Sequence, residues 1–388
     1  MRKPLLLVSL TALAACSGGG PQTAGGNAVS SGGTTTTNNN NSSNHSFENP
    51  TEKKTYSAIG GVQHFQYSTD DRNTRGQYGQ LYSGNASTAR NSGITVSYDP
   101  RDAIFELTIA DGTAGVSQNI RFQDPAHRTN FGGVQQPQNG TPNISGKGIQ
   151  YLEVGGSSGQ PGTAGFKSDL STFFYQKPGT TTKYVTFAGY LRNQLSISEV
   201  TDPNNVKYLK YDYTLDRAAF VFGERTDNSA VPKTGTATYT GDMLATMVYN
   251  PLWDVQTDAP TYYQWINGTA TTNIDFGGNS FTQTMTGTVT APGLDAYTSG
   301  THVLNSGATF AAAGHGTIDL VGKGGFTGKM DSASFTQGGT NMPVDVAGSS
   351  IDGAFYGPAA QEVGGGFRVV GAVPDQRVDI LGTFVGRK

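Results

Sequence analysis

The sequence predicts an all-β protein, with a strand-rich N-terminal domain followed by an eight-stranded antiparallel β-barrel. Three observations support this fold class. The 388 residues include 54 Gly, 18 Tyr and 19 Phe, and glycine and aromatic residues suit twisted strands joined by tight turns. Apolar residues recur at every second position in many segments, as in half-buried strands. No helical period competes over a comparable length.

The first residues are typical of an export signal. Two basic residues precede an apolar stretch from Leu5 to Leu13, and small residues follow it. The run LAAC, which ends at Cys16, matches a bacterial lipobox. We therefore expect residues 1–15 to be a lipoprotein signal peptide and Cys16 to be the acylated, palmitate-bearing first residue of the mature chain. The alternative is an ordinary signal peptide followed by a free thiol.

The lipobox predicts where the protein resides. The apolar stretch is shorter than the ~20 residues needed to span a bilayer. Acyl chains would anchor the protein instead, because each buried methylene contributes ~0.8 kcal/mol. Ser17 follows the cysteine, whereas an aspartate there usually retains a lipoprotein at the inner membrane. We expect a lipid-anchored outer-membrane protein, exposed at the surface of a Gram-negative cell.

Residues 16–50 are expected to form a flexible tether behind the acylated cysteine. They contain the runs GGG, SGG, TTTT and NNNNSSN and almost no apolar side chain, so they cannot form a core. Thirty such residues span roughly 30 Å, which is enough to hold a domain clear of the lipid headgroups.

Residues 51–232 are predicted to be a β-rich domain with long polar loops. Apolar residues alternate with polar ones in the segments 94–98 and 105–109. Further strands are expected around residues 184–191 and 220–222, where aromatic and β-branched residues gather.

Residues 233–388 are predicted to form the barrel, because about eight strands with turn residues between them fit into this segment. Closure of eight strands removes exposed sheet edges. Cys16 is the only cysteine, so no intrachain disulfide can stabilise the exported fold. Strands are expected within residues 239–249, 281–290, 314–320, 326–335, 351–356, 367–373 and 378–385.

One segment of this region resembles a known family. Residues 351–367 read IDGAFYGPAAQEVGGGF and are similar to the G-x-F-Y-G-P-x-A-x-E-x-G-G signature of the transferrin-binding protein B barrels. Shorter matches occur in the family's order at residues 235–241, 275–277, 324–328 and 381–386.

The resemblance implies a surface lipoprotein built from lobes, each with a "handle" domain and an eight-stranded barrel. This chain resembles a single lobe, with residues 51–232 as the handle and 233–388 as the barrel. Relatives bind host transferrin, haemoglobin, haem or complement factor H, and some are known only as solute-binding proteins. The transferrin-contacting loops cannot be matched to this handle residue by residue, so the resemblance implies a fold and a binding class but no ligand.

We interpret the signature itself as architectural, with ligand contact as the alternative. Its glycines would let the backbone approach a ring, and its proline would fix a turn. The carboxylate of Glu362 is expected to accept backbone amides in a turn at the following glycines. The signature residues are Gly353, Phe355, Tyr356, Gly357, Pro358, Glu362, Gly364 and Gly365.

The sequence contains no motif for catalysis, so we expect a protein that is not an enzyme. It has no Gly-x-Ser-x-Gly elbow, phosphate loop or calcium loop. The histidines lack zinc-site spacing, which predicts no metal and no cofactor. Haem remains possible through a Tyr or His ligand, although no local motif supports it. His315, flanked by glycines, is expected at a strand start in a turn or at the barrel rim. The histidines are His45, His64, His127, His302 and His315.

Ligand contact is best predicted between the first two barrel strands. Both tryptophans of the chain lie there, and Trp and Tyr are enriched at binding hot spots. In the alternative, these rings plug one barrel end or pack on the handle. The candidates are Trp253, Tyr262, Tyr263 and Trp265.

Together these features predict an outer-membrane surface lipoprotein that binds a host or environmental protein, or an iron- or haem-bearing ligand, for iron acquisition. A TonB-dependent outer-membrane receptor would be its transport partner. The alternatives are an adhesin or complement-regulator-binding lipoprotein, and an enzyme of unknown type. A net charge of −3 without a basic stripe excludes nucleic acid as a partner.

Overall fold

The computed structural model describes residues 52–72, 92–123, 141–142, 144, 146–250, 262–290, 304–373 and 376–388. The signal peptide, Cys16, the tether, Trp253 and the histidines at positions 45, 127 and 302 lie outside these residues. In the described part the protein is all-β, as predicted, and its single short helix is a 3₁₀ turn, η2, at Asn228–Ala230.

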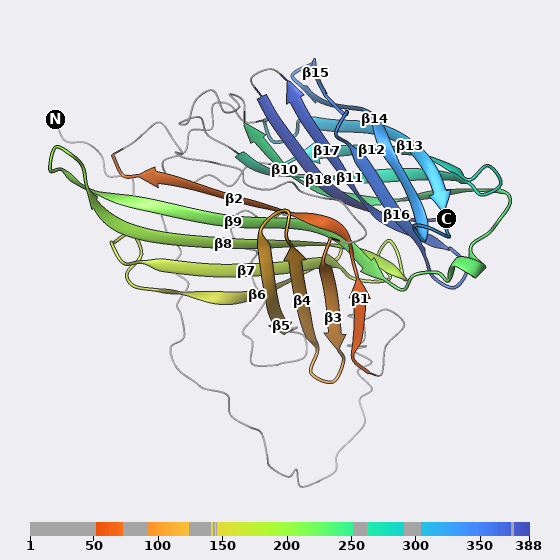
Figure 1. Cartoon of the computed structure of the whole chain (residues 1–388), viewed down its shortest axis with the longest axis horizontal. Helices are drawn as coiled ribbons and strands as arrows, with labels where there is room; N and C mark the ends of the chain where they lie inside the picture. The colour runs from red at the N-terminus through yellow and green to blue at the C-terminus, as the bar shows by residue number, and fades with distance from the viewer. Residues whose placement is uncertain are drawn as a thin grey trace, which may run out of the picture. The chain divides into compact units, whose positions relative to one another are not determined.

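Two antiparallel sheets form the N-terminal domain (Figure 1). The smaller has the order β1 (Lys54–Ser57), β3 (Ile94–Asp99), β4 (Ile104–Asp111), β5 (Val116–Gln123). The larger has the order β2 (Ile59–Asp70), β9 (Lys207–Gly223), β8 (Val185–Thr201), β7 (Lys167–Gln176), β6 (Ile149–Ser158).

The smaller sheet covers only one half of one face of the larger sheet. Between them lies an aromatic core in which Phe105 of β4 meets Phe173 and Tyr175 of β7, with ring centroids 5.5 and 5.1 Å apart. Alternation in β3 and β4 directs apolar side chains into this core.

The C-terminal domain is a closed ring of eight antiparallel strands, which confirms the predicted barrel (Figure 1). Pairing of β10 with β18 and of β13 with β14 closes the ring. A further strand, β15 (Thr340–Val344), pairs with β14 outside it. The ring order is β10 (Thr236–Asn250), β11 (Tyr262–Asp275), β12 (Ser280–Val289), β13 (Thr309–Asp319), β14 (Gly325–Gln337), β16 (Ser350–Tyr356), β17 (Glu362–Val373), β18 (Gln376–Arg387).

Aromatic rings fill the barrel. Phe326 lies at the centre of a cluster, with ring centroids 4.9 Å from Phe281, 5.6 Å from Phe355 and 6.3 Å from Phe384. These rings need space at the barrel wall. Gly353 provides it, because a Cβ on this residue would lie 2.1 Å from Cζ of Phe326.

The strands expected around residues 184–191 and 220–222 are present as parts of β8 and β9, which are longer because their outer halves are polar on one face. Three other local expectations were wrong. Residues 262–268 were expected in the connection between the first two barrel strands, but they begin β11. His315 lies inside β13 rather than at a strand start, paired with Thr282 and Lys329. The residues 364–366 lie inside β17 rather than in a turn, because their missing side chains allow close packing against other chain segments.

We expect Gly353→Ala to lower the free energy of unfolding by about 1–3 kcal/mol, because the new methyl overlaps the ring of Phe326. Urea unfolding followed by far-UV circular dichroism measures this. Gly112→Ala is the control, since a Cβ there meets nothing within 4 Å. The double variant Gly353→Ala/Phe326→Leu should recover part of the loss. Equal unfolding midpoints for Gly353→Ala and the control would contradict the steric explanation.

Candidate functional site

Of the four aromatic residues that the sequence predicted to contact a ligand, two are buried, and the side chains of the other two lie outside the described part. Tyr262 is the first residue of β11, and Trp253 lies outside the described part. Tyr263 and Trp265 lie within β11, with exposed fractions of 8% and 4%. Neither buried ring is therefore placed to contact an outside ligand.

These two rings pack on the N-terminal domain instead. Tyr263 meets Phe65 of β2 edge-on at 4.0 Å between centroids, and Trp265 meets Phe174 of β7 at 5.5 Å. Of the two interpretations that the sequence left open, packing on the handle therefore applies to both residues. The sequence signal was misleading because aromatic residues are enriched both in binding sites and in buried contacts.

The signature segment also joins the two domains. Glu362 begins β17 and is only 5% exposed. Its carboxylate accepts hydrogen bonds from the backbone amides of Lys183, Tyr184 and Val185, at 2.6, 2.7 and 3.1 Å. Burial raises the pKa of Glu362, and these three amides oppose that effect. The donors were expected in a nearby turn, but they come from the N-terminal domain.

Backbone pairing extends this joint. The amide of Thr226 donates to the carbonyl of Phe355 at 2.9 Å, and the amide of Gly357 donates to the backbone carbonyl of Glu224 at 2.9 Å. Gly357 has a φ of +82°, and a Cβ there would lie 2.6 Å from the ring of Tyr184. The signature thus packs against the N-terminal domain and forms part of the architecture.

A second barrel carboxylate reaches the same part of the N-terminal domain. Asp242 of β10 accepts hydrogen bonds from Lys147 at 2.8 Å, Gln176 at 2.8 Å and Thr181 at 2.5 Å. Burial alone raises the pKa of Asp242, but these three donors more than offset it and lower the pKa below its usual value. The ionised carboxylate is therefore favoured in the folded state.

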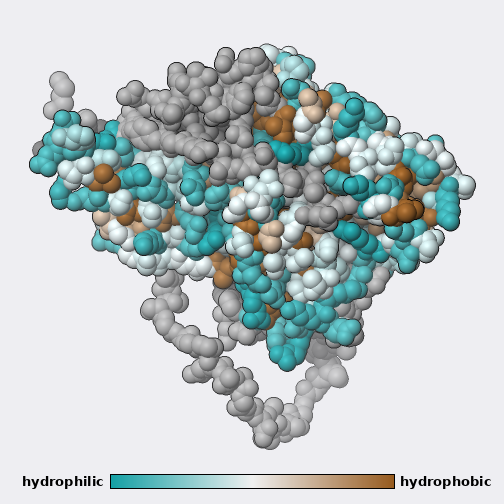
Figure 2. Space-filling view, in the orientation of Figure 1, coloured by the Kyte–Doolittle hydropathy of each residue, from teal (hydrophilic) through white to brown (hydrophobic). Residues whose placement is uncertain are grey.

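The exposed candidate site lies on the outer half of the larger sheet. There the half of the face that the smaller sheet leaves uncovered presents polar side chains in three rows across β2, β9, β8 and β7; we call this surface the polar face. Figure 2 shows mainly hydrophilic and intermediate residues over this region. The rows are His64, Asp216, Arg192, Ser171; then Gln66, Thr214, Gln194, Asp169; then Ser68, Asp212, Ser196, Lys167.

Strand alternation explains why this surface is polar. On the opposite face of the same strands, Phe65, Tyr67 and Leu215 pack with Val248 and Tyr263 of the barrel. Because side chains alternate between faces, that contact turns the intervening polar residues away from the barrel.

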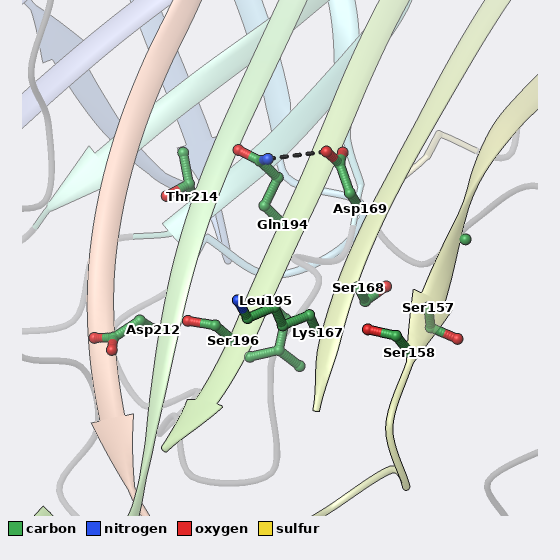
Figure 3. A pocket seen from close by; sticks show the side chains of 11 residues that line it. Ser157, Ser158, Lys167, Ser168, Asp169, Gln194, Leu195, Ser196, Asp212 and Thr214 are labelled. Carbon is green, nitrogen blue, oxygen red and sulfur yellow. Dashed lines mark hydrogen bonds between the residues drawn. The ribbon is translucent and has the colours of Figure 1, made fainter. Parts of the chain in front are cut away.

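The polar face is hollowed in two adjoining places. A cavity of about 650 Å³ lies over β6–β9 and is lined by residues that include Lys167, Gln194 and Thr214 (Figure 3). A second hollow of about 530 Å³ lies against β5. Gly156 and Asp169 line both, so the two form one continuous groove.

Ion pairs neutralise most charges of the polar face. Arg192 binds Asp169 through two hydrogen bonds of 2.8 and 2.6 Å. Gln194 also donates to Asp169, at 3.0 Å, as Figure 3 shows. The bond from Arg192 lowers the pKa of Asp169. Lys210 pairs with Asp212 at 2.7 Å. The surface is therefore rich in hydrogen-bonding groups but carries little uncompensated charge.

A network at the inner end of the groove fixes β5 on the larger sheet. Asp216 binds His64 at 2.6 Å and Gln118 at 2.5 Å, and Tyr190 donates to Gln118 at 2.5 Å. Ser171 contacts Tyr190 rather than the histidine. In the described part, His64 thus has no hydroxyl that it could activate as a nucleophile.

Among the described residues, no group of three or more His, Cys, Asp and Glu side chains is placed to hold a metal ion. None of the helices in this part of the chain is long and apolar enough to cross a membrane.

The closed barrel with its attached β-rich domain defines the class of protein: a lobe that pairs a barrel with a handle. Residues 231–388 match the family model described as the C-lobe and N-lobe β-barrels of Tf-binding protein B. This part of the chain is therefore similar to those barrels. No curated protein matches the sequence.

Solved structures of transferrin-binding protein B show a loose similarity. A double mutant from Haemophilus parasuis Hp5 is 12% identical, with 85% of this chain and 76% of that chain covered and a TM-score of 0.32. The isotype 1 protein from serogroup B Neisseria meningitidis is 13% identical, with 87% and 77% covered and a TM-score of 0.25. Similarities this low do not bear on ligand or partner.

The sequence reasoning missed the polar face. Its signal was present as polar residues at alternate positions of β2, β8 and β9. The face is recognisable only when the register places these residues side by side.

We expect Trp265→Ala to lower the free energy of unfolding by about 3–5 kcal/mol, because it removes a buried ring that packs on Phe174. Chemical denaturation measures the change. Val321→Ala is the control, because the side chain of Val321 is fully exposed and should change stability by less than about 0.5 kcal/mol. A loss as small as that of the control would show that the ring is not an essential packing contact.

The lowered pKa of Asp242 predicts an acid-sensitive joint. The stabilisation from its ionised carboxylate is complete above the ordinary pKa of 3.8 and is lost as the pH falls through the lower folded-state value. Asp242→Asn should reduce the free energy of unfolding near pH 7 by about 1–3 kcal/mol and weaken its dependence on pH below about 4.

Urea unfolding at several pH values checks this prediction. Asp102→Asn serves as the matched control, because Asp102 pairs with Arg101 at an exposed position. If the free energies of unfolding of Asp242→Asn and the wild type change in parallel with pH down to pH 2, Asp242 is not the titrating group.

Proposed function

We propose that this protein is a lipid-anchored outer-membrane surface protein that binds a host protein, or an iron- or haem-bearing ligand, for iron acquisition. The match of residues 231–388 to the barrels of Tf-binding protein B carries this proposal. The proteins with those barrels are named for binding transferrin. Iron-loaded transferrin is therefore the first ligand to test.

The proposed anchor and domain arrangement follow from the sequence. Acylated Cys16 holds the chain in the membrane, and residues 16–50 carry the lobe clear of the lipid surface. Residues 51–232 act as the handle and 233–388 as the barrel. The protein performs no covalent chemistry; it presents a preformed surface and transfers its ligand to a TonB-dependent outer-membrane receptor.

The chemistry of the groove argues against haem at the polar face. A haem site needs an axial ligand such as His, Tyr, Cys or Met. The residues that line the two hollows include none of these types. Trp253 and Tyr262 remain candidates for contact with the host protein.

The test uses the mature chain with Cys16→Ser, immobilised and exposed to host serum. We expect mass spectrometry to identify retained transferrin, and visible spectra of the purified protein to lack a porphyrin band. An unrelated immobilised β-barrel protein is the control. A porphyrin band would support the haem form of the proposal instead. Retention of no iron-bearing ligand, or of complement regulators or matrix proteins alone, would contradict iron acquisition.

Anchoring is tested separately in cells. Labelled palmitate should enter the wild-type chain and be absent from Cys16→Ala, and protease added outside intact cells should digest only surface-exposed protein. Label in Cys16→Ala, or full protection of the wild type from protease, would contradict the proposed anchor or its surface exposure.

A further inference from the structure

The groove on the polar face differs from an ordinary solvated sheet surface. Exposed strands are commonly protected by long charged side chains. Here Gly156, Ser158, Ser196 and Thr214 are small, and their size leaves the hollow of about 650 Å³. Cavities of roughly 300–1,000 Å³ are typical of small-ligand sites.

The groups left free in this hollow are mostly uncharged. Asp169 and Asp212 are neutralised by Arg192 and Lys210. By contrast, the side chains of Ser158, Ser196, Thr214 and Lys167 make no hydrogen bond or ion pair with the described part of the chain. On the polar face a ligand therefore meets the hydroxyls of Ser158, Ser196 and Thr214, each of which can donate and accept, and the free ammonium of Lys167.

Gln194 lies among these free groups. Its amide nitrogen donates to Asp169, which orients the side chain and leaves the amide oxygen as an acceptor (Figure 3). Because Asp169 is itself held by Arg192, the amide is pre-oriented toward the hollow rather than free to rotate.

Other ligand classes fit this surface less well. The centre of a protein-binding patch is usually apolar or aromatic, whereas the only large apolar residues lining the two hollows are Ile120, Val154 and Leu195. A polyanion needs an excess of positive charge, but Arg192 is paired with Asp169, which leaves Lys167 as the single uncompensated basic residue of the lining.

We propose that this groove binds a neutral oligosaccharide, with Gln194, Ser196 and Thr214 at the centre of the site. A sugar presents many hydroxyls in a small volume, which matches a surface of unpaired hydroxyls and little net charge. The adjoining hollow, which shares Gly156 and Asp169, extends the groove and favours a chain of sugars over a single one.

This inference rests on the proposed function, because it specifies how a surface-binding protein would hold part of its partner. The same sugars can come from two sources: the glycan of a captured host glycoprotein, or a free or cell-surface polysaccharide. In both cases the ligand chemistry at the groove is the same.

The test applies the purified mature chain to an array of neutral and acidic oligosaccharides, and titrates the strongest neutral ligand by calorimetry. We expect the double variant Ser196→Ala/Thr214→Val to bind about 5- to 150-fold more weakly, because two hydrogen bonds together contribute about 1–3 kcal/mol. Thermal melts establish that the variant is folded.

The matched control is Thr282→Val/Ser332→Ala, which removes the same two hydroxyl types from exposed positions on the barrel. It should bind the sugar as the wild type does. Equal affinity of both double variants, or binding to no neutral oligosaccharide, would overturn the proposal. Exclusive binding of acidic sugars through Lys167 would overturn the assignment of a neutral ligand.

A last comparison separates this inference from the proposed function and identifies the source of the sugar. Host serum proteins are offered before and after enzymatic removal of their glycans. Loss of capture on deglycosylation supports a glycoprotein source, and binding of array sugars without any serum protein supports a polysaccharide. Capture of deglycosylated transferrin without any sugar binding would leave the proposed function standing and overturn the groove assignment.

Discussion

The structure depends on two carboxylates of the barrel that accept hydrogen bonds from the N-terminal domain, at Lys147 and within residues 176–185. Glu362 accepts hydrogen bonds from the backbone amides of residues 183–185, and Asp242 accepts hydrogen bonds from the side chains of Gln176, Thr181 and Lys147. A buried carboxylate is stable only when its oxygens are fully hydrogen-bonded. Each carboxylate therefore requires its donors on the other domain, and this mutual requirement fixes the barrel against the larger sheet.

That joint determines which parts of the N-terminal domain are available to a ligand. With the barrel held in place, the aromatic side of β2 and β9 is buried against Val248 and Tyr263. The alternate residues then face away, with their charges paired and several hydroxyls free. Because side chains alternate along each strand, one face of the larger sheet packs on the barrel and the other face presents the groove.

The barrel could be predicted largely from the sequence because its inner and outer residues alternate strongly. Phe281 and Met285, for example, point inward between exposed threonines. Within the signature, Gly353 accommodates the ring of Phe326. The role of Trp265 could not be decided in the same way, because an aromatic ring near a loop is equally compatible with a ligand contact and with a buried contact.

The sequence by itself determined the all-β class and the closed barrel, because strand periodicity and turn glycines are local properties of the chain. Tertiary structure alone decided what Glu362 binds, where Tyr263 and Trp265 lie, and that polar residues from four strands form one surface. The physical reason is sequence separation: residues such as 169, 194 and 214 become neighbours only through strand register, which no local pattern specifies.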